Sequence, residues 1–114
     1  MEKRTPHYDL SSIKSAVRLR GADSFTASAL IGAQAMGLEI VQAIDVICMM
    51  NRTNFYKSMT THESSQIWQD VYHPVTPCGI AYTLHWMKLR FGYSRYVYPI
   101  PVERDVMIGL KSAI

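Results

Sequence analysis

The first half of the chain places its apolar residues at the spacing of amphipathic helices. Three helices are predicted, from Asp9 or Ser11 to about Arg20, from Ser24 or Thr26 to Gly37, and from about Glu39 to Met50. The first two begin at side chains that favour helix N-termini, and a glycine marks the end of each. The third has the most continuous apolar stripe, so we expect it to pack deepest against a sheet.

From Asn54 onward the pattern changes to the alternation of apolar and polar residues that is typical of strands. The predicted strands are Asn54–Thr61, Ile67–Tyr72, the stretch Ile80–Tyr98 with a break at Gly92, and Val106–Lys111. The first two are separated by turn residues and predict a hairpin. Three N-terminal helices packed on a C-terminal antiparallel sheet make an α+β domain.

Length and composition favour one folded domain. The chain has 114 residues, enough for a single hydrophobic core, and 48% of them are hydrophobic against 18% charged. The longest apolar stretch, Ala27–Met50, is interrupted by polar and charged residues that are costly in lipid, so no membrane-spanning helix is predicted. Met1–Asp9 lacks the apolar segment of a signal peptide, and we expect a cytoplasmic protein.

The net charge of +3 is unevenly distributed. Residues 1–20 carry five basic and two acidic side chains, residues 21–82 carry two and five, and residues 83–114 carry five and two. Basic ends can attract a polyanion such as RNA to one face, because phosphate attraction follows local charge. The alternative is that scattered lysines and arginines only solvate the surface.

Cysteine and histidine spacing predicts neither a metal site nor a cofactor. Cys48 and Cys78 are too few for a disulfide scaffold or a zinc site, and we interpret both as reduced thiols. The histidines show no metal-ligand spacing, and we assign none of them to a catalytic site; they are His7, His62, His73 and His85.

The predicted hairpin brings a cation and an amide together. Strand alternation places Phe55, Lys57 and Met59 on one side of the sheet, and a turn centred on Glu63 places Lys57 directly opposite Gln69. A register slip of one residue would move Gln69 to the other face. Lysine and glutamine on a half-exposed strand are also common as solvated surface.

Four segments of the chain resemble one known family. They are Met1-Glu2-Lys3-Arg4-Thr5-Pro6-His7, Phe55-Tyr56-Lys57-Ser58-Met59-Thr60-Thr61, Ile67-Trp68-Gln69-Asp70-Val71-Tyr72 and Gly79-Ile80-Ala81-Tyr82. Together they resemble the MqsR (motility quorum-sensing regulator) toxins of bacterial toxin–antitoxin pairs, over about residues 1–82. The resemblance implies a RelE-like fold and an endoribonuclease that cleaves mRNA without the ribosome at GCU-like sites.

The resemblance also implies the site residues. The family's catalytic lysine, glutamine and tyrosine fall on Lys57, Gln69 and Tyr82. Residues 83–104 depart from the family pattern, within what we treat as a single MqsR-like domain of residues 1–114. The family's second lysine therefore matches Lys111 best, with Lys88 as the alternative.

RNA supplies its own nucleophile, the 2′-hydroxyl beside the scissile phosphate, so the protein needs to position it, transfer protons and stabilise charge. We expect Lys57 and Lys111 to stabilise phosphate charge, Tyr82 to act in acid–base chemistry and Gln69 to position the substrate, with no metal. The implied partner is an MqsA-like antitoxin, through which DNA would be contacted only indirectly. The alternative is a catalytically impaired remnant that binds RNA or its antitoxin without cleaving.

Overall fold

The computed structural model describes residues 1–61, 66–75, 82–91 and 102–112. Its elements are β1 (Glu2–Lys3), α1 (Leu10–Arg20), η1 (Gly21–Ser24), α2 (Ala27–Ala35), α3 (Ile40–Cys48), η2 (Arg52–Asn54), β2 (Phe55–Thr60), β3 (Trp68–Tyr72), β4 (Tyr82–Phe91) and β5 (Val102–Ser112). The predicted α+β class is confirmed. The short strand β1 precedes the helices and was not predicted.

Local capping explains where the helices begin and end. Asp9 accepts a hydrogen bond from the amide of Ser12 at the start of α1, and Thr26 accepts one from the amide of Ala29 at the start of α2. After α2 the chain turns at Gly37, whose φ of 75° lies in the left-handed region that favours glycine. The predicted helix boundaries are therefore confirmed to within about two residues.

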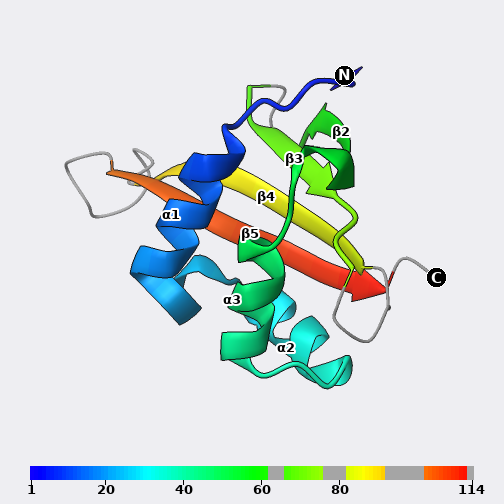
Figure 1. Cartoon of the computed structure of the whole chain (residues 1–114). Coiled ribbons are helices and arrows are strands. Elements are labelled where there is room, and N and C mark those ends of the chain that lie inside the picture. The colour runs from blue at the N-terminus through cyan, green and yellow to red at the C-terminus, as the bar shows by residue number, and fades with distance from the viewer. Residues whose placement is uncertain (62–65, 76–81, 92–101, 113–114) are drawn as a thin grey trace.

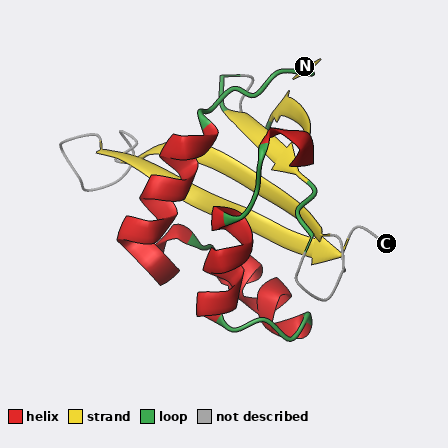
Figure 2. Cartoon of the chain, in the orientation of Figure 1, coloured by secondary structure: helices red, strands yellow, loops and turns green. Residues whose placement is uncertain are grey.

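The strands form one antiparallel meander in the order β1-β2-β3-β4-β5. The three α-helices lie on the same side of this sheet (Figures 1 and 2). Strand alternation divides the side chains of the sheet between a helix-side face and an outer face. The outer face, as we define it from the described side chains, consists of Lys57, Met59, Gln69, Val71, Thr83 and His85.

The hydrophobic core lies between the helices and the helix-side face. It consists of Ile13, Val17, Phe25, Ala29, Ala33, Ala43, Val46, Ile47, Met50, Tyr72, Leu84 and Trp86. Trp86 and Leu84 are each 1% exposed, so β4 contributes two large apolar side chains to the centre of the domain.

The expectation that the third helix packs deepest against the sheet is wrong. The main contact between a helix and the sheet joins α2 to β5, whereas α3 packs on α1, η1 and α2. The alanines Ala29 and Ala33 on the buried side of α2 explain this, because small side chains allow close approach of a helix to a strand.

In the described part of the chain, no single helix is both long enough and apolar enough to cross a membrane. Helices α2 and α3 meet that test only as a pair, and a bend of 95° separates them.

The hairpin register differs from the prediction by two residues. Lys57 pairs with Val71, and Gln69 pairs with Met59. A β-bulge between Phe55 and Lys57 accounts for a second difference, since Phe55 pairs with Tyr72 and packs against the core instead of sharing the side of Lys57. A shift of two residues preserves the face, so Lys57 and Gln69 remain on the same side of the sheet as diagonal neighbours.

A buried carboxylate attaches the N-terminal segment to the sheet. Asp70 is fully buried on β3, and its carboxylate accepts hydrogen bonds from the backbone amides of His7 and Tyr8 at 2.9–3.0 Å. The Tyr8 hydroxyl donates to the Trp68 carbonyl at 2.6 Å, and the His7 ring stacks on Trp68. These contacts hold the end of the arm, residues 1–8, against β3, while its first residues pair with β2.

Replacing Asp70 with asparagine is expected to lower the free energy of unfolding by about 2–4 kcal/mol, because hydrogen bonds to a buried charged acceptor are strong and the amide group would face an N–H donor. Urea denaturation measures this loss. The matched control is Asp45→Asn on the exposed side of α3, expected to change stability by less than about 0.5 kcal/mol. Equal stability of the two variants would contradict the role given to Asp70.

Candidate active site

The candidate site lies on the outer face, where three strands place polar side chains in adjacent rows. Lys57, Val71, His85 and Gly109 form one row across β2, β3, β4 and β5, because each pairs with the next. Gln69 belongs to the neighbouring row and sits diagonally between Lys57 and His85. The structure therefore brings together Lys57 and Gln69 as predicted, and it adds His85.

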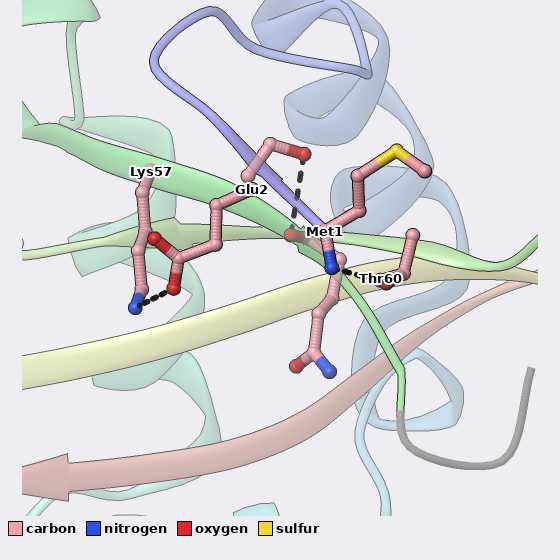
Figure 3. Close-up of polar contacts among 6 residues, drawn as sticks. Met1, Glu2, Lys57 and Thr60 are labelled. Atoms are coloured by element: carbon pink, nitrogen blue, oxygen red, sulfur yellow. Dashed lines mark hydrogen bonds and ion pairs between the residues drawn. The ribbon is translucent and has the colours of Figure 1, made fainter. Parts of the chain in front are cut away.

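Lys57 is held by an acid from the arm. Its Nζ lies 2.7 Å from the Glu2 carboxylate, and its side chain is 22% exposed (Figure 3). The arm fixes this position, since Glu2 pairs with Met59 and the Met1 amino group donates to the Thr60 hydroxyl. Hydrogen bonding to Lys57, and then its charge, hold the pKa of the Glu2 carboxyl below its usual value. The ammonium of Lys57 thus already binds an oxyanion in this structure.

Gln69 is held by His85. The side chain of Gln69 is largely buried, and its Oε1 lies 2.8 Å from Nδ1 of His85. Because an amide oxygen accepts hydrogen bonds but does not donate them, Nδ1 carries the proton in this contact. The pair fixes the direction of both side chains on the outer face.

The other two predicted site residues are located by their strand positions alone. Tyr82 is the first residue of β4 and pairs with Ser112, and Lys111 on β5 pairs with Thr83. Position 111 therefore falls on the outer face beside the row of His85 and Gly109. Position 82 alternates with Leu84 and Trp86 and falls on the helix-side face, so the backbone does not bring it to the side of Lys57 and Gln69. The alternative, Lys88, pairs with Asp105. The side chains of these three predicted residues lie outside the described part.

Sequence reasoning missed His85, which it set aside with the other histidines. The signal that would have identified it is the pairing of β3 with β4, because only the register Val71–His85 places this ring beside Gln69. That register depends on the connection between the two strands, which carries no local pattern from which pairing can be read.

A second tyrosine on the hairpin is unsuited to proton transfer. Tyr72 is fully buried on the helix-side face, and burial, followed by the nearby charge of Asp70, raises its pKa to about 12. Its phenol stays protonated at neutral pH. Among the described residues, no group of three histidine, cysteine or acidic side chains could hold a metal ion.

Comparisons with known proteins agree on one family. Residues 5–91 match the family model described as motility quorum-sensing regulator, toxin of MqsA. The chain is also 45% identical, over 82 residues, to the mRNA interferase toxin MqsR of Escherichia coli (strain K12), and the match covers 72% of this chain and 83% of that protein. The matched region contains Lys57, Gln69, Tyr82 and His85.

The pairing of Glu2 with Lys57 predicts a measurable titration. Because the pKa of Glu2 is lowered in the folded protein, the pair stabilises the fold above the usual glutamate pKa, and this contribution is lost as pH falls through the lowered value. In Lys57→Met, the pKa of Glu2 should rise toward that of an exposed glutamate, measured by NMR of the side-chain carboxyl. Arg4→Gln is the control, since Arg4 lowers this pKa less than Lys57 does. An unchanged Glu2 titration in Lys57→Met would show that the pair does not form in solution.

Proposed function

The chain belongs to the MqsR family of toxins, and from this membership we propose that it cleaves mRNA as an endoribonuclease, independently of the ribosome, with a preference for GCU-like sites. Its natural partner is an MqsA-like antitoxin that holds it inactive, and contact with DNA comes only through that antitoxin. Since mRNA cleavage and antitoxin binding are both intracellular activities, the proposal includes a cytoplasmic location.

One observation supports this function best: the outer face holds an ammonium and a carboxamide side by side, and the ammonium already pairs with an oxyanion. The Glu2 carboxylate at Lys57 has the charge of a phosphodiester and the same type of acceptor oxygen. An RNA phosphate can take its place when Glu2, which is exposed at the sheet edge, moves aside. Gln69 can then donate an amide N–H to the phosphate or a base edge while its Oε1 stays on His85.

Cleavage proceeds by attack of the 2′-hydroxyl on the adjacent phosphorus. The P–O5′ bond breaks, and the products are a 2′,3′-cyclic phosphate and a 5′-hydroxyl. Lys57 and Lys111 stabilise the negative charge on the phosphate oxygens, and Gln69 positions the substrate. The family resemblance assigns proton transfer to Tyr82, but its strand position alternates with Leu84 and Trp86 on the helix-side face, so we assign proton transfer at the outer face to other groups. This mechanism requires no metal ion from the solution.

The test is cleavage of a GCU-containing RNA by the purified protein in EDTA, with product ends identified by mass spectrometry. Lys57→Ala should lower the rate by at least about 10²-fold, the usual effect of removing a preorganised charge contact. The matched control is Arg18→Ala, which removes an exposed cation from α1 on the helix side and should leave the rate unchanged. RNA binding without cleavage by the parent would support the non-catalytic alternative, and equal rates for parent and Lys57→Ala would refute the site.

A cognate antitoxin provides an independent test of the partner. The antitoxin gene product, co-expressed with the chain, should co-purify as a complex and suppress RNA cleavage. Failure of the parent to bind its antitoxin would contradict the proposed pairing without affecting the nuclease assay.

A further inference from the structure

The proposed reaction needs two proton transfers, and the outer-face residues assigned so far provide an acid but no base. A base must remove the proton of the 2′-hydroxyl, and an acid must protonate the leaving 5′-oxygen. A lysine ammonium can give up a proton but cannot accept one, and a neutral amide such as Gln69 is suited to neither transfer. The ammonium of Lys57 can therefore serve as the acid, and the site lacks a base as its partner.

His85 has the position that such a partner requires. It lies in the same row as Lys57, two strands away, so their backbones are about 10 Å apart at a strand spacing of about 4.8 Å. Side chains of lysine and histidine that extend from these positions can both reach one phosphodiester lying over Val71, the buried residue between them on β3. His85 is partly exposed, unlike the neighbouring Trp86, which faces the core at 1% exposure.

The contact with Gln69 sets the chemistry of the ring. Nδ1 donates to Oε1 of Gln69, so in the neutral imidazole the lone pair is on Nε2. The same contact persists when Nε2 gains a proton, because Nδ1 is a donor in both forms. Gln69 therefore orients the ring without opposing its change of charge.

The backbone beside His85 leaves room for a substrate. Gly109 pairs with His85 on β5, and a Cβ built at this glycine would meet no atom of the described structure within 4 Å. A larger residue would place its side chain on the outer face at this point, since paired residues share a face. Because it has no side chain, Gly109 leaves the space on the outer face next to the imidazole open.

We infer that His85 is the general base of this nuclease, an inference that rests on the proposed function. Nε2 of His85 removes the proton of the 2′-hydroxyl as the 2′-oxygen forms its bond to phosphorus. The P–O5′ bond breaks, and the 5′-oxygen takes a proton from the ammonium of Lys57, which lies in the same row of the outer face. Exchange with water afterwards removes the proton from the imidazole and restores it to the acid.

The test measures single-turnover cleavage of the GCU-containing RNA by the full chain. His85→Ala should cleave about 10²- to 10⁴-fold more slowly than the parent. Its affinity for a 2′-O-methyl RNA of the same sequence, which cannot be cleaved, should remain within about twofold. Added imidazole should restore part of the rate of His85→Ala and leave the parent unchanged. The control is His73→Ala, whose ring stacks on Tyr56 away from Gln69 and whose rate should equal that of the parent.

Two outcomes would overturn the role of His85 while leaving the nuclease intact. The first is a cleavage rate for His85→Ala within about tenfold of the parent. The second is a slow His85→Ala variant that imidazole does not rescue, which would show that His85 only positions Gln69. A parent that does not cleave RNA would refute the proposed function and this role together. If His85→Ala does not fold, His85→Gln keeps a polar side chain of similar length and carries the same predictions.

Gly109→Val tests the room beside the ring separately. Valine favours strands and fits the space there, so the unfolding midpoint should be preserved. Binding of the 2′-O-methyl RNA should weaken, because the new side chain occupies the surface where the substrate lies against His85. Unchanged binding and cleavage would mean that RNA does not pass over this part of β5, and the base would have to be sought elsewhere.

Discussion

The site depends on one buried acid that is not part of it. Asp70 accepts the amides of His7 and Tyr8 from inside the domain, and these hydrogen bonds fix where the arm crosses the sheet. With the arm held there, β1 pairs along β2 and brings the Glu2 carboxylate to Lys57. A fully buried carboxylate needs such donors, because an unpaired buried charge is strongly destabilising. The electrostatics of the outer face therefore follow from a requirement of the core.

Strand alternation places the residues that form the core and the residues that can act chemically on opposite faces of the same short strands. On β3, Asp70 and Tyr72 belong to the helix-side face, while Gln69 and Val71 belong to the outer face, where they are nearly covered at 8% and 2% exposure. On β4, His85 lies between Leu84 and Trp86, both nearly inaccessible. Residues adjacent in the chain thus meet different demands, and a substitution on one face leaves the packing of the other largely unchanged. This arrangement allows a small domain to carry polar groups on a sheet whose opposite face forms the hydrophobic core.

The features predicted correctly from the sequence are those that local chemistry determines. Capping side chains and glycines mark the helices, and alternation marks β2 and β3. The features that were missed arise from contacts between distant segments. Strand β1 has two residues and lies on an arm whose anchor, Asp70, is 62–63 residues away in the chain. The close approach of α2 to β5 likewise joins segments that are far apart in the sequence. No local pattern carries that information.

Lys57 and Gln69 share one face of the sheet although the predicted hairpin register was wrong. Side chains repeat every two residues along a strand, so a shift of two changes the neighbours of Lys57 and Gln69 but not their face. The bulge after Phe55 then allows the chain to bury that ring and still present Lys57 outward. In the observed register Gln69 is opposite Met59 instead of Lys57, which leaves its amide oxygen available to the next strand, where His85 donates to it. The direct pair expected between lysine and glutamine is thus replaced by two pairs, Glu2 with Lys57 and Gln69 with His85, and the surface between them is where a phosphodiester can be held from both sides.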